Sequence, residues 1–449
     1  GRTDKGAEAS RSHIGGLAGS ISMELVFKKA GILTFTNQEE LCHAAVALSS
    51  QPLPKGNKVG IITNTGGPSV IAIDELVSCG MEIPPLSEKA ANVLKETMLE
   101  SASIRNPLDV VATAGPAHFK SAFEVMLKEK QFDSIYLNFV TPPFVDCENV
   151  AREIVNATRG GDKPVVCNYM TDKQKWSETS KILKEGEIPC FDFAETAARA
   201  LYALVRYNRI RLRKEGEIKY FQDVNKERIG SVLQNARAQK RENLSAFEVY
   251  SILEACKIPV ATWKVAINAK EVISIANEIG FPVVIKADSE KLIHKSDAGG
   301  VAVNIKNGDE ATDVVEKMQK NFGGGLKFLV QKYIPGGREL IIGAKAEDGV
   351  GNIVMFGLGG IFVEVLKDVS FTISPVSDVE AMEMITSIKA APLINGFRGE
   401  KGINKEKTAE IIQRISMLVS DFQEIKELDL NPLLATGNDI CVVDARIII

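Results

Sequence analysis

The feature that most constrains the fold is a regular alternation of short apolar runs and longer amphipathic segments through residues 58–206. The apolar runs are rich in β-branched and aromatic residues, as in KVGIIT (58–63) and SIYLNFV (134–140). The segments between them space their apolar residues as a helix does, as in ETAARALYALVRY (195–207). Strands that alternate with helices form βαβ units around a parallel sheet. The sequence therefore predicts a parallel α/β domain here.

The regions on either side differ in character. Residues 207–242 are rich in Lys, Arg and Glu, and we expect a charged surface helix or an interdomain linker there. Residues 243–449 mix helical segments with strand-like runs such as LKFLVQKYI (326–334), a pattern typical of an antiparallel sheet covered by helices. We expect the parallel domain at 51–206 and the end of a preceding domain at 1–50.

Composition limits the class of protein. The chain has 449 residues, of which 45% are hydrophobic and 25% charged, as in a globular protein with several domains. Its net charge of -4 argues against nucleic acid as a partner, and no apolar stretch approaches a membrane span. The seven cysteines form no CxxC pair, which favours buried thiols and a cytoplasmic location. The first residue is Gly1 rather than Met, which indicates a fragment or a processed chain.

The strongest chemical signal is a series of phosphate-binding residue types, in order, within 243–449. Lys286 ends a strand-like run, and a lysine on a rigid strand meets phosphates as a fixed point charge. Glycine-rich turns follow, and these let backbone N–H groups approach phosphate oxygens. The candidate residues for nucleotide and phosphate here are Lys286, Gly299, Gly300, Gln331, Arg338, Gly357, Gly359 and Gly360.

Two residues with side-chain oxygens lie near the C-terminus. Asn431 belongs to ELDLNPL and Asp444 to VVDAR, and we expect both at adjacent strand ends. Mg²⁺ takes few protein ligands and keeps phosphates and waters, so this pair suits it. Each signal alone is typical of ordinary turns and solvated side chains. Together and in order, they predict a magnesium–nucleotide site.

Two glycine-rich segments outside that region also suit phosphate chemistry. His13 lies in SHIGGLAG, where the glycines leave room for a phosphoryl group beside a nucleophilic neutral imidazole. The segment NTGGPSV places Gly66 and Gly67 at the start of a helix, whose free N–H groups and positive dipole attract phosphate. His43 and His118 lie in helix-patterned stretches, and we expect surface or hydrogen-bonded side chains there.

Several of these segments resemble ADP-forming acetyl-CoA synthetases, relatives of succinyl-CoA synthetase. KADSEKLIHKSDAGGV, GRELIIGAK, MFGLGGIFVEVLKDVSF and EIKELDLNPLL resemble their ATP-grasp part. GRTDKGAEASRSHIGGLAG resembles their phosphohistidine loop, with Ile14 in place of the usual Thr. NTGGPSV and IRNPLDV, which contains Asn106 and Asp109, resemble their flavodoxin-like domain. The resemblance implies an α/β multidomain protein, with a flavodoxin-like parallel domain followed by a two-subdomain ATP-grasp fold at 243–449.

The resemblance also implies a reaction in which acyl-CoA, phosphate and ADP are interconverted with carboxylic acid, CoA and ATP. An acyl phosphate would pass its phosphoryl group to His13, and His294 in the HKSD stretch would relay it to ADP. Asp429 would steady the phosphohistidine. By the same resemblance, Lys286 and Arg338 would lie near the phosphates, Gln331 at the adenine hinge, and Asn431 and Asp444 on Mg²⁺.

The implied cofactors are ATP or ADP and Mg²⁺, with CoA as a substrate. A CoA-binding domain is expected in the same polypeptide or as a partner chain, because the family carries one before this region. An oligomer is expected as well. Two alternatives stay open: an ATP-grasp ligase without a phosphohistidine, and a regulatory nucleotide-binding module derived from this family. The histidine-glycine loop argues against the first alternative, and the complete candidate set favours catalysis over the second.

Overall fold

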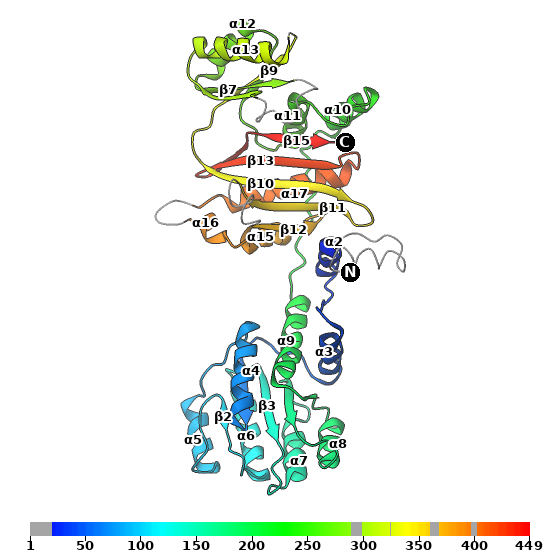
Figure 1. Ribbon diagram of the computed structural model, residues 1–449, viewed down its shortest axis with the longest axis vertical. Coiled ribbons are helices and arrows are strands. Elements are labelled where there is room, and N and C mark those ends of the chain that lie inside the picture. Colours follow the sequence, from blue (N-terminus) through cyan, green and yellow to red (C-terminus); the bar gives the residue numbers. More distant parts are fainter. Residues whose placement is uncertain (1–19, 289–298, 324, 360–367, 397–401) are drawn as a thin grey trace. The chain divides into compact units, whose positions relative to one another are not determined.

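The computed structural model describes residues 20–288, 299–323, 325–359, 368–396 and 402–449 (Figure 1). The chain divides into two compact units. One consists of residues 31–213, and the other of residues 214–449 with the N-terminal stretch up to residue 30.

Residues 31–213, all of them described, form a five-stranded parallel sheet in the order β2-β1-β3-β4-β5. This order reverses direction beside β1, as in flavodoxin-like folds, and it confirms the predicted parallel α/β domain. The apolar runs of the sequence become its strands because they are buried on both faces. The strands are β1 (Val59–Thr63), β2 (Leu108–Asp109), β3 (Ser134–Val140), β4 (Val165–Met170) and β5 (Cys190–Phe191).

Helices cover both faces of this sheet because successive strand residues point to opposite sides. Ile61 packs in one core and its neighbour Ile62 in the other. The first core contains α3 (Gln38–Ser50), α4 (Gly66–Ser78) and α9 (Ala194–Arg211). The second contains α5 (Glu88–Thr97), α6 (Pro116–Lys128), α7 (Cys147–Thr158) and α8 (Ser177–Glu185).

The packing of three helices differs from the domain limits expected from the sequence. Helix α3 packs against α9 and therefore lies within the parallel unit, although the sequence predicts that residues 1–50 belong to a preceding domain. Helix α9 continues to Arg211, beyond the expected limit at 206. Helix α10 (Lys226–Ala238) buries Ile229 and Leu233 in the core of the second unit, although its charged sequence reads as a linker.

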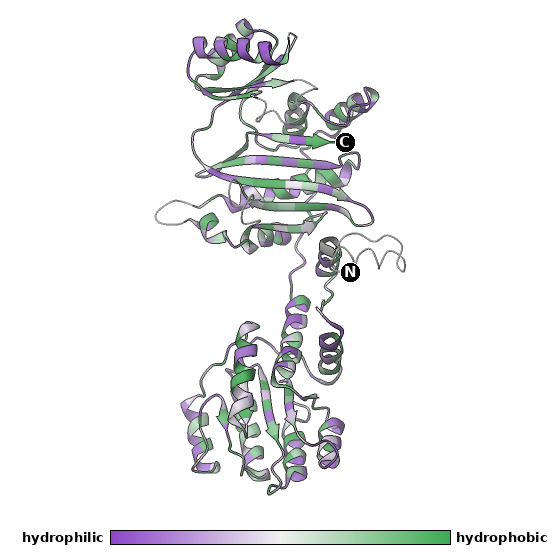
Figure 2. Ribbon diagram, in the orientation of Figure 1, coloured by the Kyte–Doolittle hydropathy of each residue, from purple (hydrophilic) through white to green (hydrophobic). Residues whose placement is uncertain are grey.

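The second unit contains two antiparallel sheets. The smaller has the order β6-β9-β7-β8, and α12 (Ala269–Ile279) and α13 (Gly308–Phe322) pack against it. Figure 2 shows hydrophilic residues on these two helices and hydrophobic residues along the strands that they cover. The strands are β6 (Trp263–Ala266), β7 (Val283–Asp288), β8 (Val301–Ile305) and β9 (Lys327–Lys332).

The larger sheet has the order β12-β11-β10-β13-β14, with β15 also paired to β13. One core joins it to α10, α11 (Ala246–Ala255), α15 (Asp378–Ser387), α16 (Ala391–Asn395) and α17 (Lys405–Asp421). Helix α2 (Ser20–Lys29) attaches beside β12, where Lys29 pairs with Glu380 at 3.0 Å. The strands are β10 (Arg338–Glu347), β11 (Gly351–Leu358), β12 (Val369–Ile373), β13 (Glu427–Thr436), β14 (Asp439–Val442) and β15 (Ala445–Ile448).

The NPL segment lies inside a strand rather than at the strand end expected from the sequence. Leu340 of β10 faces Leu433 of β13, but Ile342 faces Leu430, so two residues of β13 stand opposite one of β10. Pro432 cannot donate a backbone hydrogen bond to a neighbouring strand, and a β-bulge accommodates such a residue. Asn431 therefore lies in this bulge, where the regular hydrogen bonding between β10 and β13 is interrupted.

None of the helices in the described ranges combines the length and the apolar character that a membrane span requires.

Candidate functional site

Lys286 lies at the junction between the two antiparallel sheets of the second unit. Strand β7 carries it beside β9, where it pairs with Leu329. The residue is only 5% exposed, yet its ammonium Nζ reaches the segment between β14 and β15. There it donates to the carbonyl oxygen of Val443 at 2.6 Å and to Oδ1 of Asp444 at 2.8 Å. A buried lysine stays charged only with such partners. Burial lowers its pKa, but Tyr250 and Asp444 outweigh burial, and the net pKa is raised.

Tyr250, which the sequence analysis did not single out, connects the predicted residues. It lies on α11 and is 1% exposed. Its hydroxyl Oη lies 3.3 Å from Nζ of Lys286 and 3.3 Å from Nε2 of Gln331. The same hydroxyl donates to the carbonyl oxygen of Val443 at 2.8 Å. The sequence feature that could have indicated Tyr250 is its hydroxyl group, which lies on the apolar face of a helix and therefore needs a buried hydrogen-bond partner.

The two predicted metal ligands lie next to each other. The backbone N–H of Asn431 donates to the carbonyl oxygen of Asp444 at 3.1 Å. The Asp444 side chain is 52% exposed and Asn431 is exposed, so both can reach a ligand. Within the described residues, no cluster of three or more His, Cys, Asp or Glu could hold a metal. One carboxylate and one amide oxygen fit Mg²⁺, which completes its shell with phosphates and waters.

Asp429 lies two positions before Asn431 on β13 and opposite Arg446 of β15. Burial, and after it the charges of Glu427 and Asp444, outweigh the lowering effect of Arg446 and raise the pKa of Asp429 to about 6. A carboxyl group with this pKa can exchange a proton near neutral pH. The geometry therefore places a protonatable acid beside the predicted metal ligands.

The predicted glycines of the second unit lie on both sheets. Gly299 has φ +75°, a conformation that favours glycine, and the carbonyl oxygen of Gly300 accepts from the backbone N–H of Ala287 on β7. Gly359 donates its N–H to the carbonyl oxygen of Glu339 at 2.8 Å, and a Cβ there would lie 2.8 Å from the Cβ of Glu339. Gly357 is a buried residue of β11 opposite Val369 of β12, and Arg338 begins β10 as a half-buried residue. Gly360 lies outside the described residues.

Gly66 and Gly67 form the first turn of α4, in the parallel unit. This turn follows β1 at the carboxyl edge of the sheet, next to the point where the strand order reverses. Both glycines are exposed, and a Cβ on either would meet no atom of the described chain within 4 Å. The turn can therefore accept a phosphate against its N–H groups.

Asn106 has an architectural role in the same unit. Its side-chain Nδ2 donates to the carbonyl oxygens of Val59 and Pro84, and its Oδ1 accepts from the N–H of Ile61. Asp109 accepts from the N–H of Val111. Both residues of the IRNPLDV motif thus hold backbone around β1 and β2.

The described histidines make local contacts. His118 accepts at Nδ1 from the N–H of Gly115 and caps α6, and His43 packs edge-on against Phe191. His13 and His294, the predicted phosphorylation sites, lie outside the described residues.

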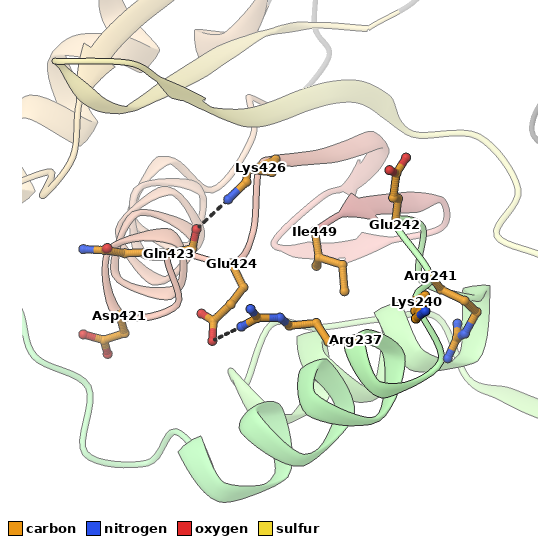
Figure 3. Close-up of a pocket in the computed structure, with 9 residues that line it drawn as sticks. All are labelled: Arg237, Lys240, Arg241, Glu242, Asp421, Gln423, Glu424, Lys426 and Ile449. Carbon is orange, nitrogen blue, oxygen red and sulfur yellow. Dashed lines mark hydrogen bonds and ion pairs between the residues drawn. The ribbon is translucent and has the colours of Figure 1, made fainter.

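A separate hollow of about 700 Å³ lies between the ends of α10 and α17 and the start of β13 (Figure 3). Arg237 faces Glu424 across it at 3.6 Å, and Lys426 donates to the carbonyl oxygen of Gln423. Its lining carries both signs of charge, and none of the predicted site residues lines it.

An antiparallel sheet pair with a buried lysine, a nearby carboxylate and glycine turns defines a nucleotide-binding domain of the ATP-grasp class. Residues 235–449 match the ATP-grasp domain family, and residues 59–213 match the Ligase-CoA domain family. The 4-hydroxybutyrate–CoA ligase [ADP-forming] of Nitrosopumilus maritimus is 36% identical over 457 residues, which cover 100% of this chain and 65% of that protein. The beta subunit of acetate–CoA ligase [ADP-forming] I of Pyrococcus furiosus is 42% identical over 224 residues, 49% of this chain and 96% of that subunit.

The chain belongs to the ADP-forming acyl-CoA synthetase family. A solved structure of the Ca. Korarchaeum cryptofilum dinucleotide forming acetyl-coenzyme A synthetase 1, in complex with coenzyme A and Ca-AMPCP, is 38% identical. It aligns with 49% of this chain and 98% of that one at a TM-score of 0.47. The chain spans about 65% of the length of the first two full-length relatives that it matches.

Proposed function

We propose that the chain performs the nucleotide half of an ADP-forming acid–CoA ligase reaction. In the whole reaction, phosphate displaces CoA from acyl-CoA and leaves an acyl phosphate. A histidine then takes the phosphoryl group and releases the carboxylic acid. The phosphohistidine finally transfers the group to ADP and forms ATP, with the histidine restored.

The observation that carries this proposal is the cluster of Lys286, Gln331 and Asp444 around Tyr250. Lys286 lies on the smaller sheet and Asp444 on the segment between β14 and β15 of the larger sheet, so a nucleotide between the sheets would contact both. In this proposal Lys286 binds the phosphates as a point charge and Gln331 lies at the base. Arg338 and the glycines Gly299, Gly300, Gly357, Gly359 and Gly360 complete the phosphate contacts.

Magnesium would be held by Asn431 and Asp444 together with phosphate oxygens, and it would neutralise charge on the phosphoryl group in transfer. Asp429, with its raised pKa, would accept a hydrogen bond from the imidazole N–H or hold a proton near it.

His13 is the proposed phosphoryl acceptor and His294 the proposed relay to ADP. Gly66 and Gly67 would hold the phosphate or phosphohistidine at the start of α4. The acyl-CoA step requires a CoA-binding domain, in the same polypeptide or as a partner chain. Separate alpha and beta subunits occur among the Pyrococcus furiosus relatives. We further propose an oligomer in the cytoplasm, where the seven free thiols would stay reduced.

Phosphorylation of the 449-residue chain by ATP tests this proposal. With Mg²⁺ and ATP labelled at the γ-phosphate, we expect a protein label that is lost in acid and stable in alkali. His294→Ala should abolish labelling of His13, and His13→Ala should leave label on His294. Label on His13 in the His294→Ala chain would contradict the relay alone.

The two alternatives predict other results in the same assay. A regulatory module would bind Mg²⁺–ATP without any covalent label. An ATP-grasp ligase without a phosphohistidine would also stay unlabelled, but it would form ADP when a carboxylic acid is added. Either result would overturn the phosphohistidine mechanism.

A further inference from the structure

The hydroxyl of Tyr250 is the point where three parts of the second unit meet. Tyr250 comes from α11, Lys286 and Gln331 come from the smaller sheet, and Val443 comes from the segment beside the larger sheet. The tyrosine is 1% exposed and Gln331 is also 1% exposed. These polar groups are therefore held by one another rather than by water.

The chemistry of the partners determines the direction of each hydrogen bond. A backbone carbonyl can only accept, so the Tyr250 hydroxyl proton points to Val443 at 2.8 Å. The ammonium of Lys286 and the Nε2 amide of Gln331 can only donate, so both point to the lone pairs of the same oxygen. A hydroxyl has one proton and two lone pairs, and this arrangement uses all of them.

The surroundings keep this hydroxyl in place. The Tyr250 ring lies 5.6 Å from the ring of Trp263, which stands opposite Gln331 on β6. The indole Nε1 of Trp263 donates to Glu254, on the same helix as Tyr250, at 2.9 Å. Helix α11 is thus joined to the smaller sheet through Glu254 and through Tyr250 itself, and both contacts hold the tyrosine in position.

We propose that Tyr250 is a positioning residue for the nucleotide. Its hydroxyl holds the Lys286 ammonium toward the phosphates and orients the Gln331 amide toward the base. Through Val443 it also ties both side chains to the segment that carries Asp444, so the phosphate and metal contacts form together. This inference rests on the proposed function and adds a residue that has no direct contact with the reacting atoms.

A double-mutant cycle on the 449-residue chain tests the inference. The measurement is the Kd of ADP with Mg²⁺ by calorimetry, for wild type, Tyr250→Phe, Lys286→Met and both together. We expect Tyr250→Phe to weaken binding about tenfold, as for a lost hydrogen bond to a charged group. Because the tyrosine acts largely through the lysine, the double variant should bind within about threefold of Lys286→Met.

Tyr136→Phe is the matched control. Tyr136 is a buried tyrosine whose hydroxyl donates to the carbonyl oxygen of Ala194 at 2.8 Å, in the parallel unit. Its substitution removes the same group and should lower Tm while leaving the Kd of ADP unchanged. A loss of affinity in both variants would mean a general effect of stability and would overturn the positioning role.

Gln331→Leu is a second variant, which tests the inference even if Tyr250→Phe lowers the stability of the protein. It removes the amide while the tyrosine stays, and should weaken ADP binding but leave binding of Mg²⁺–pyrophosphate, which lacks a base, unchanged. Wild-type ADP affinity in either Tyr250→Phe or Gln331→Leu would overturn the inference. It would also be overturned if the double variant lost affinity by the product of the losses in Tyr250→Phe and Lys286→Met, because the two residues would then act independently. If the wild-type chain bound no Mg²⁺–ADP, the proposed function would fail first, and the inference with it.

Discussion

The ammonium nitrogen of Lys286 lies 2.8 Å from Oδ1 of Asp444, a residue 158 positions further along the chain. One is the predicted phosphate-binding lysine and the other a predicted magnesium ligand. The lysine is almost fully buried and the aspartate is half exposed. In the proposed site, a phosphate group would meet the lysine charge on one side and the carboxylate of the proposed metal ligand on the other.

Replacing Lys286 by Met should weaken Mg²⁺–ADP binding by about 1.5–3 kcal/mol, the usual effect of losing a charged hydrogen bond. Calorimetry on the whole chain measures this. Lys264→Met is the control, because Lys264 lies on β6 of the same sheet and pairs at the surface with Glu278. Equal affinities for wild type and Lys286→Met would contradict the phosphate-binding role.

Replacing Asp444 by Asn should remove most of the magnesium dependence of ADP binding, because the carboxylate supplies the charge that attracts the ion. The measurement is the ratio of ADP Kd values without and with Mg²⁺. That ratio should fall toward one in Asp444→Asn and stay at the wild-type value in Asp439→Asn. Asp439 is 86% exposed and pairs with Lys407 instead. An unchanged ratio in Asp444→Asn would remove this residue from the metal site.

A fragment of residues 243–449 should be less stable than one of residues 214–449, although both contain every predicted nucleotide contact. The shorter fragment loses α10, whose Ile229 and Leu233 are at most 2% exposed. Burial of two such side chains contributes about 3–6 kcal/mol in total. Urea unfolding of the two fragments measures the difference. Equal midpoints would show that α10 is the linker expected from its charge.

The Glu248 carboxylate should stabilise the second unit only above mildly acidic pH. It accepts from the backbone N–H of Ser245, the residue that caps the start of α11, and pairs with Arg241 at 2.7 Å. Burial alone would raise its pKa, but Arg241 and Ser245 outweigh burial and the net pKa is lowered. A lowered folded pKa means that the contribution is complete above the ordinary glutamate pKa and is lost as the pH falls through the folded value.

Glu248→Gln should therefore lower the free energy of unfolding by about 1–2 kcal/mol at pH 7, with the difference from wild type shrinking at strongly acid pH. Chemical unfolding followed over a pH series measures it. Glu310→Gln, at the similar cap of α13, is the comparison, because the Glu310 carboxylate accepts from the backbone N–H of Lys306 and the side-chain amide of Asn307. A difference from wild type that does not change with pH would contradict this assignment.

Asn106→Ala should destabilise the parallel unit by about 2–3 kcal/mol, since it leaves the Val59 carbonyl and the Ile61 N–H of β1 without this partner. ADP binding should stay unchanged, because the Asn106 side chain bonds to Val59, Ile61 and Pro84, which belong to the parallel unit. Thermal unfolding and calorimetry of the same sample measure the two effects. Weaker ADP binding at full stability would instead indicate a role in the site.

The sequence by itself determined the parallel unit, because its signals are local. Alternation of β-branched runs with helical periodicity predicts βαβ units, and SIYLNFV coincides with β3 (Ser134–Val140). The sequence also predicts Lys286, Gln331 and Asp444 as site residues, because each belongs to a short motif with its own residue chemistry. The helix that begins at Gly66 follows from the turn in the same way.

Only the tertiary structure decided how these residues meet. The contact between Lys286 and Asp444 joins two sheets, and no periodicity in the chain specifies such a pairing. Tyr250 lies within an ordinary amphipathic helix, so its part in the site depends on partners 36 and 81 positions away. The sequence of α10 predicts a charged linker because most of its residues are polar and lie on its exposed face. A few buried side chains nevertheless pack the helix against the core. Local pattern determines which elements form, and long-range packing determines which side chains share a site.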